Sequence, residues 1–232
     1  ETLRNVAKRV VKGGTIEYFT IFPEDIPNNE MKDVSIDEIM NEINKLIGMN
    51  ELKRQLIDLI LYSKYMYRKI LSGEKNEPLC LHLALVGNPG TGKTTVAKLL
   101  GRAYQQIGLL TKGHVVEVDR SDLVGSYIGQ TEEKTMSVIN KAEGGILFID
   151  EAYSVFTGSD KDFGKQAVDI LVKQMEDNRS NLMVVLAGYP KEMERLLNSN
   201  PGLRSRISRI IRFPDYTDDE LVEILKVMCK NN

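Results

Sequence analysis

A glycine-rich segment at residues 87–94 has the residue types and the spacing of a phosphate-binding loop. Its sequence, GNPGTGKT, matches the pattern G-x-x-x-x-G-K-[ST]. Glycines are needed where a backbone curls around a phosphate, because a Cβ would block both the positive φ angles and the close approach. Lys93 is placed to reach the β- and γ-phosphates of a nucleotide, and the Thr94 hydroxyl to bind Mg²⁺. The residues expected to contact the nucleotide here are Asn88, Pro89, Gly90, Thr91, Gly92, Lys93, Thr94 and Thr95.

Two adjacent acids, Asp150 and Glu151, follow the apolar run Ile146–Ile149. In parallel sheets, ligands bind at the carboxyl ends of the strands. We expect Asp150 to hold Mg²⁺, directly or through water, and Glu151 to polarise a water in line with the γ-phosphate. Two acids at a strand end are weak evidence by themselves, because such acids often only face solvent. The presence of a phosphate-binding loop in the same chain favours the catalytic interpretation.

The nucleotide base is expected to be adenine. A guanine site would require the sequence Asn-Lys-x-Asp, but the Asn-Lys pairs at 44–45 and 140–141 are followed by Ile47 and Glu143 at the position of the Asp. Because Glu151 is suited to activating water, we expect hydrolysis of ATP rather than transfer of a phosphoryl group to a small acceptor.

The elements around these residues predict an α/β fold with a parallel sheet. The segment 81–86, which leads into the loop, is apolar nearly without alternation, as is typical of a strand buried on both faces. Helical patterns alternate with the strands, which favours a sheet covered on both faces. The expected strands are 81–86, 115–118, 146–149, 182–187 and 210–213.

Capping signals mark the helices at the two ends of this pattern. Residues 35–38 (SIDE) and 217–220 (TDDE) each form a capping box, and each predicts that a helix begins there. Gly48 is expected to end the first helix, and a second amphipathic helix follows as far as a loop at 72–78. Residues 1–34 contain two adjacent glycines, an aromatic cluster and two prolines, and we expect an appendage or linker.

The composition and charge of the chain limit the classes of protein to which it can belong. The 232 residues carry 31 Lys and Arg against 33 Asp and Glu, a net charge of −2, so no broad nucleic-acid surface is expected. Cys80 and Cys229 lie far apart without a C-x-x-C spacing, which fits a reducing cytosol. No apolar run approaches the length of a membrane span, so no membrane partner is expected. We expect His82 and His114 to be structural.

Together these residues resemble the AAA+ ATPases, and within them the subfamily of stage V sporulation protein K and the red-type Rubisco activases. The resemblance runs from about Ile36 to the C-terminus and leaves out residues 1–34. The segments that carry it are LIG at 46–48, GNPGTGKTTVAKLLG at 87–101, DLVGSYIGQT at 122–131, GGILFIDEAYS at 144–154, LAGYP at 186–190 and NPGLRSR at 200–206.

The resemblance implies a P-loop NTPase sheet of order 5-1-4-3-2, a small helical lid and an ATP-dependent homo-oligomeric ring, usually a hexamer. It divides the chain into the appendage at 1–34, an AAA+ core at 35–213 and the first helix of a truncated lid at 214–232. Ile47 and Gly48 would border the adenine. Arg206 matches the arginine that reaches the nucleotide of a neighbouring subunit, with Arg204 as a second candidate; a guanidinium supplied in trans would make hydrolysis depend on assembly.

The resemblance also implies a loop that grips a polypeptide. Tyr127, Ile128 and Gly129 match the aromatic-apolar-glycine loop that lines the pore of the ring, between Gly125 and a helix expected to open at Thr131. An alternative is a hairpin tip that packs on a neighbouring element. The leading hypothesis is therefore a protein-remodelling ATPase; the alternatives are a DNA-acting motor or loader, and a nucleotide-gated assembly scaffold.

The chain departs from the family pattern in two places, and these limit which residue roles can be transferred from the family to this chain. AAA+ proteins usually place a polar sensor residue, often Asn, at the end of the fourth strand, whereas this chain has Gly188 and Tyr189 there, and Asn181 falls at the opposite end of the strand. The chain also lacks an initiator Met and stops after the first helix of the lid, so we expect a fragment with weakened assembly or hydrolysis. Neither the client nor the choice between sporulation and carbon fixation can be predicted.

Overall fold

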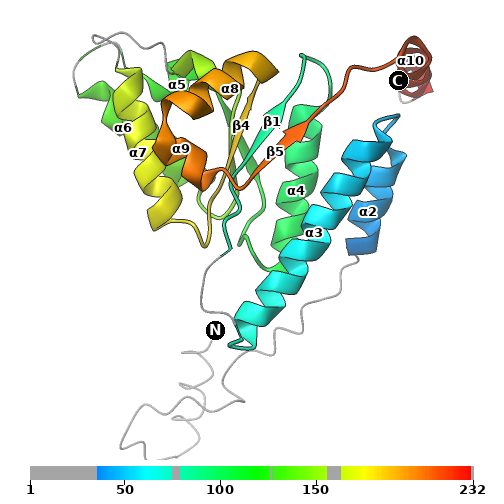
Figure 1. The fold of residues 1–232 in the computed structure, drawn as a ribbon, viewed down its shortest axis with the longest axis horizontal. Coiled ribbons are helices and arrows are strands. Elements are labelled where there is room, and N and C mark those ends of the chain that lie inside the picture. The colour runs from blue at the N-terminus through cyan, green and yellow to red at the C-terminus, as the bar shows by residue number, and fades with distance from the viewer. Residues whose placement is uncertain (1–35, 75–78, 126, 128, 156–162, 231–232) are drawn as a thin grey trace, which may run out of the picture. The chain divides into compact units, whose positions relative to one another are not determined.

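A computed structural model describes residues 36–74, 79–125, 127, 129–155 and 163–230, all within the unit 35–232 (Figure 1). The predicted appendage at 1–34, Ser35 of the first capping box and Ile128 lie outside the described residues. The strands are β1 (Leu83–Val86), β2 (Val115–Val118), β3 (Ile146–Ile149), β4 (Met183–Gly188) and β5 (Arg209–Arg212). The helices are α2 (Ile36–Lys45), α3 (Asn50–Leu71), α4 (Lys93–Ile107), α5 (Arg120–Leu123), α6 (Gln130–Ala142), the 3₁₀ helix η2 (Ala152–Val155), α7 (Gly164–Asp177), α8 (Pro190–Ser199), α9 (Pro201–Arg206) and α10 (Asp218–Lys230).

The five strands form one sheet of order β2-β3-β4-β1-β5, with every neighbouring pair parallel. This order, written from the other edge, is the predicted 5-1-4-3-2. Leu83 opens β1 opposite Val185 of β4 and Arg209 of β5. β2 and β3 have the predicted bounds, whereas β1 begins two residues later than predicted, β4 begins and ends one residue later, and β5 begins and ends one residue earlier. The ends of a strand depend on which of its residues pair with the neighbouring strands, and the apolar pattern along one strand does not specify that pairing.

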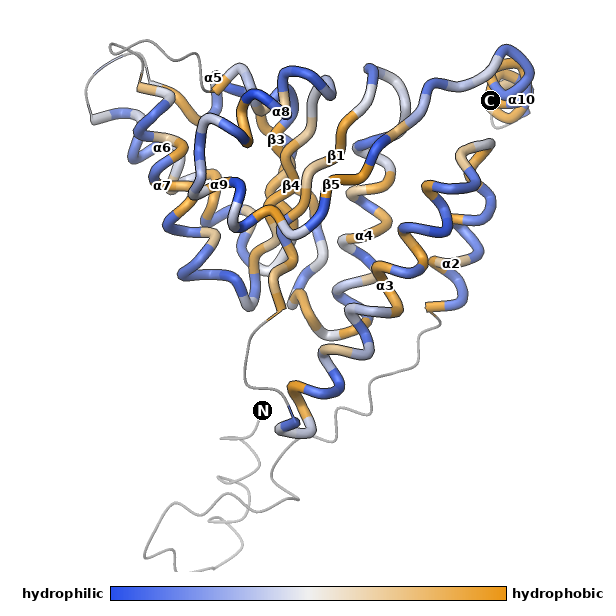
Figure 2. The backbone as a smooth tube through the Cα atoms, in the orientation of Figure 1, coloured by the Kyte–Doolittle hydropathy of each residue, from blue (hydrophilic) through white to orange (hydrophobic). Residues whose placement is uncertain are grey.

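Alternate residues of β1, β3 and β4 bury into two separate cores, one on each face of the sheet. Leu83 and Leu85 face the core shared with α2, α3 and α4. Ala84 and Val86 face the core shared with α5, α6, η2, α7, α8 and α9. Figure 2 shows the apolar segments concentrated in the strands between these helices. These three central strands are continuous apolar runs because both of their faces are covered, whereas in the edge strand β5 only Ile211 is buried.

The turn between α2 and α3 needs a backbone that only glycine adopts easily. Gly48 has φ +63 and is followed by Met49 at φ +51. A Cβ at residue 48 would overlap the Glu220 carboxylate. Glu220 in turn accepts the Thr217 amide at 2.8 Å, and its own amide donates to Thr217 Oγ1 at 3.3 Å. The capping box predicted at 217–220 is therefore formed, and it lies beside the turn at Gly48.

The sequence did not predict the three short elements α5, η2 and α9, and it misplaced the start of α6. Asp119 caps the four-residue helix α5 through a complete capping box with Asp122, and η2 follows directly after the acidic pair. Helix α6 begins at Gln130 with Gly129 as its N-cap, so the prediction that Thr131 opens it is wrong. The buried Thr131 hydroxyl instead accepts the Gly125 amide at 3.0 Å.

The two histidines bond to backbone groups. The buried His82 ring bonds to Met175 O at 2.8 Å through Nε2 and accepts the Val184 amide at 3.0 Å through Nδ1. His114 Nε2 lies 2.7 Å from Lys141 O. Both arrangements agree with the structural role predicted for them. None of the helices in the described part of the chain is long and apolar enough to cross a membrane.

Candidate active site

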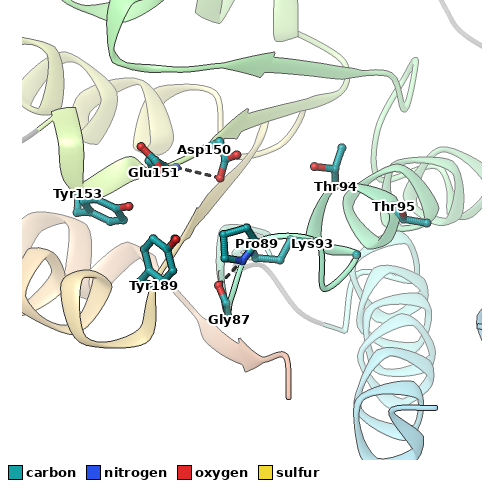
Figure 3. Close-up of a pocket in the computed structure, with 12 residues that line it drawn as sticks. Gly87, Pro89, Lys93, Thr94, Thr95, Asp150, Glu151, Tyr153 and Tyr189 are labelled. Atoms are coloured by element: carbon teal, nitrogen blue, oxygen red, sulfur yellow. Dashed lines mark hydrogen bonds between the residues drawn. The ribbon is translucent and has the colours of Figure 1, made fainter. Parts of the chain in front are cut away.

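A pocket of about 380 Å³ opens at the carboxyl ends of β1, β3 and β4 (Figure 3). It brings together the phosphate-binding loop and the acidic pair, which are far apart in the sequence. Its size is that of a small-molecule site. The lining residues are Gly87, Pro89, Gly90, Gly92, Lys93, Thr94, Thr95, Asp150, Glu151, Tyr153, Gly188 and Tyr189.

The loop between β1 and α4 has the geometry of a phosphate cradle. Gly90 and Gly92 have φ +75 and +91, which strongly favour glycine. Gly92 caps α4 without a side-chain hydrogen bond, so the amides of the first helical turn are left without a capping side chain. A helix start with this arrangement attracts a phosphate through both its amides and its dipole.

Lys93 folds back over this loop. Its Nζ donates to Gly87 O at 2.9 Å and to Asn88 O at 2.8 Å. Burial lowers the pKa of Lys93, and the nearby Asp150 carboxylate partly opposes that effect by favouring the charged form. The ammonium is thus held at the pocket wall, from which it can turn to a phosphate oxygen.

The acidic pair sits on a strained backbone. Glu151 has φ +44, which is uncommon for a residue with a Cβ and is often associated with functional sites. Its amide donates to Asp150 Oδ1 at 3.0 Å (Figure 3). This turn places the two carboxylates at different positions along the pocket, with Asp150 between Glu151 and Thr94 in the view of Figure 3. The two acids are therefore placed for different tasks.

The residues of the pocket fit a magnesium ion shared with phosphates. Mg²⁺ is usually bound by one or two carboxylates together with substrate phosphates and water. Asp150 and the Thr94 hydroxyl both line the pocket and supply such oxygens. Across the described residues, no group of three or more His, Cys, Asp or Glu side chains could hold a metal by itself. The donor set thus suits an ion that arrives with a nucleotide.

Several predicted nucleotide contacts do not line this pocket. The Asn88 side chain turns away and donates to both carboxylate oxygens of Asp215, at 2.8 and 3.0 Å. The Thr91 hydroxyl donates to Asn88 O at 2.7 Å, within the loop itself. Ile47 and Gly48 lie at the turn after α2, outside the lining. Their contact with adenine stays a prediction.

The two candidate trans-acting arginines also lie outside the pocket of their own chain, on α9. Asn200 caps this helix by accepting the Leu203 amide at 2.9 Å. Arg204 is exposed, whereas Arg206 is partly buried. Arg206 donates to Gly202 O at 3.2 Å and lies 3.6 Å from the Glu176 carboxylate. Within one chain, the structure brings neither arginine to the phosphate-binding loop.

The predicted pore-loop segment has a fixed base and an exposed tip. The Thr135 hydroxyl, fully buried, donates to Leu123 O at 2.9 Å, and the Gly125 amide bonds to Thr131. A Cβ at Gly125 would lie 2.5 Å from Gln130 Cβ, so the base closes tightly. The Tyr127 residue is 71% exposed.

Three pocket residues were not assigned a role from the sequence. Gly188 and Tyr189 were noted only because they occupy the end of the fourth strand, where the family usually has an Asn. Tyr153 was given no role. The sequence signal that could have placed Tyr153 at the site is its position, two residues after the acidic pair. Asn181 lies before β4, where its Oδ1 accepts from the Thr111 amide and hydroxyl at 3.2 and 3.1 Å. It therefore faces away from the site, as its sequence position predicted.

Comparison with known proteins identifies the family. Residues 83–215 match the family described as "ATPase family associated with various cellular activities (AAA)". The chain belongs to this family. Stage V sporulation protein K of Bacillus subtilis is 47% identical over 203 residues, which cover 88% of this chain and 63% of that protein. Protein CbbX of Cereibacter sphaeroides is 45% identical over 192 residues, covering 81% of this chain and 61% of that protein.

Two further matches agree with the subfamily and the fold of this AAA chain. The chloroplastic ribulose bisphosphate carboxylase/oxygenase activase of Cyanidioschyzon merolae is 41% identical over 206 residues, which cover 87% of this chain and 69% of that protein. The AAA domain of FIGL-1 in complex with ADP superposes with a TM-score of 0.57 at 16% identity, covering 85% of this chain and 68% of that one. The latter match supports the fold alone. The chain spans less than two thirds of the length of the first relatives it matches.

Proposed function

We propose that this chain is the nucleotide-binding core of a ring-forming ATPase that remodels a polypeptide client. The observation that carries the proposal is the pocket in which the phosphate-binding loop meets Asp150 and Glu151 at one edge of the sheet. Sequence identity to a protein named as an activase of another protein favours a polypeptide client.

The roles of the pocket residues follow from their chemistry. The amides at the start of α4 and the Lys93 ammonium bind the β- and γ-phosphates of ATP. Asp150 and Thr94 hold Mg²⁺, which, when bound, offsets negative charge on the phosphates. Glu151 acts as the general base that takes a proton from the attacking water.

Assembly into a ring completes the site in trans. Arg206, or Arg204 beside it, supplies a guanidinium to the γ-phosphate held by the neighbouring subunit. A planar guanidinium is suited to this because its fixed fork of donors matches the phosphate oxygens. Both arginines lie outside the pocket of their own chain, which supports a site completed by a neighbouring subunit.

Tyr127 is the proposed client grip. A tyrosine ring gives a large apolar contact with few rotatable bonds and tolerates many client side chains. Its exposure at the tip of a segment whose base is tied to α6 fits a part that moves with the nucleotide cycle.

The test is Tyr127→Ala in the full-length protein, with permanently unfolded casein as the polypeptide probe and duplex DNA as the alternative. We expect wild-type hydrolysis to be stimulated by the polypeptide, and the variant to lose this stimulation while keeping ATP affinity and assembly. Tyr65→Ala is the matched control, because that exposed tyrosine lies on α3 and lines no part of the pocket.

Other outcomes would point to the alternative functions. Stimulation by DNA and not by the polypeptide would replace the proposal with a DNA-acting motor. ATP-dependent assembly with no effect of either probe would indicate a scaffold. A variant that loses ATP binding or melts early would make Tyr127 a packing residue.

A further inference from the structure

The Arg120 side chain joins helix α5 to the 3₁₀ helix η2. Its Nη1 donates to Ser154 O at 2.5 Å and to Val155 O at 3.1 Å. These carbonyls belong to the last two residues of η2, and the carbonyls at the end of a helix need partners from outside it. Arg120 is half-buried and opens α5 directly after the N-cap Asp119. A charged donor in this place binds both carbonyls more strongly than a neutral one would.

The backbone turn that carries the acidic pair is held at both ends by the segment 118–120. At one end, Val118 O accepts the Asp150 amide at 2.9 Å. At the other end, the Ser154 amide donates to Glu151 O at 2.7 Å, while Arg120 binds the carbonyl of the same Ser154. Glu151, with its φ of +44, lies between these contacts. Its strained backbone is therefore connected through hydrogen bonds to the end of β2 and to α5.

The other end of α5 leads into the base of the segment that carries Tyr127. Lys134 Nζ, on α6, donates to Ser121 O at 3.0 Å and to Val124 O at 3.4 Å. Tyr127 O accepts the Gln130 amide at 3.3 Å, at the start of α6. Helix α5 is thus bonded to the turn of the acidic pair through its first residue and to the base of the Tyr127 segment through its later residues.

A cavity of about 750 Å³ lies next to this connection. Its lining includes Asp150 and Glu151 together with Val124 and Gly125 of the loop base. Close packing across this space cannot pass a shift of the carboxylates on to the loop, because a cavity has no atoms to transmit it. Arg120 lines the same cavity and bonds the elements that carry the two groups.

We propose that Arg120 is a positioning residue that couples ATP hydrolysis at Glu151 to the movement of the Tyr127 segment. Its guanidinium holds α5 to η2, so that a change in the turn of the acidic pair displaces the base of the client loop, and a client pulling on Tyr127 acts back on the turn. The proposal rests on the roles proposed above for Glu151 and Tyr127.

Arg120→Met in the full-length protein tests the proposal, because it keeps most of the aliphatic stem and removes the donors. We expect the stimulation of ATP hydrolysis by permanently unfolded casein to fall to a ratio of about one, the value for uncoupled sites, while KM for ATP stays at the wild-type value. Arg120→Lys returns a charged donor and should recover part of the stimulation. Arg102→Met is the matched control, since Arg102 also joins two helices, α4 and α2, by bonding Glu42, but on the other face of the sheet.

Binding of casein separates coupling from grip. Glu151→Gln should bind ATP without turning it over, and adding Arg120→Met to it should leave the affinity for casein unchanged, whereas adding Tyr127→Ala should remove it. Weaker casein binding with Arg120→Met would show that Arg120 shapes the grip itself, which would overturn the inference.

Three further outcomes are decisive. Undiminished stimulation in Arg120→Met would overturn the inference and leave the proposed function intact. An equal loss in Arg120→Met and Arg120→Lys, with an earlier urea unfolding midpoint in both, would make Arg120 a packing residue. A wild-type protein that casein does not stimulate would instead overturn the proposed function.

Discussion

Arg206 Nη2 lies 3.6 Å from Glu176 Oε2 of its own chain, at the point where the end of α9 meets the end of α7. The guanidinium also donates to Gly202 O, while its Nε is buried without a hydrogen-bond partner among the described residues. The Glu176 side chain is half exposed, so the ion pair stays accessible to water and contributes little to stability. Arg206 is thus held near the surface by weak contacts that a phosphate on a neighbouring subunit could replace.

Arg206→Ala is expected to leave ATP binding unchanged and to lower turnover roughly a thousandfold or more, the effect typical of an arginine supplied in trans. Mixing this variant with Lys93→Ala should restore part of the activity, because the two lesions fall in different shared sites of a mixed ring. The measurement is steady-state ATP hydrolysis across mixing ratios.

Arg204→Ala is the control for Arg206, since it changes an exposed arginine on the same helix. Near-normal turnover in this variant would single out Arg206. If Arg204→Ala is the inactive one and is rescued by Lys93→Ala, the trans-acting residue is Arg204. Mixed rings that form without any rescue would rule out a donor in trans.

Gly48→Ala should lower the free energy of unfolding by more than Gly73→Ala does. Both glycines have positive φ, +63 and +76, and a Cβ in this region costs about 1–2 kcal/mol. At Gly73 the added methyl meets nothing within 4 Å, whereas at Gly48 it overlaps Glu220, which must leave its capping contact with Thr217. Urea unfolding of both variants measures the difference; equal losses would show that the Glu220 contact is unimportant.

Stability should depend on pH through His82. The neutral ring satisfies two buried backbone groups, since Nε2–H donates to Met175 O and Nδ1 accepts the Val184 amide. Burial lowers the pKa of His82 from its usual 6.5, because a second ring proton would be desolvated and would oppose the Val184 N–H. The unfolded chain therefore binds a proton at a higher pH than the folded chain does.

The sign of the effect follows from this order of protonation. The contribution of His82 is full above about pH 6.5 and decreases as the pH falls below that value toward the folded pKa, by at most about 1.4 kcal/mol per pH unit. His82→Gln removes the titration, so its stability deficit relative to wild type should shrink between pH 7.5 and pH 5.5 in urea unfolding. A deficit that is the same at both pH values would contradict the prediction.

The sequence by itself determined those features that a short stretch of chain encodes. The loop at 87–94, the acidic pair after β3 and the capping box at Thr217 each depend on residues within a few positions of one another, and the structure has all three where they were predicted. The strands 115–118 and 146–149 were predicted to the residue because polar or glycine residues flank their apolar runs.

Tertiary structure alone decided which distant residues share the site. Only the parallel pairing of β3 with β4 and of β4 with β1 brings Tyr153 against Gly188, 35 positions away in the chain, and closes the pocket with Tyr189. Likewise, Asn88 was expected to contact the nucleotide, but its side chain donates a hydrogen bond to Asp215, which lies in the segment after β5. No local pattern contains such contacts, because they depend on the packing of elements whose separation in sequence says nothing about their separation in space.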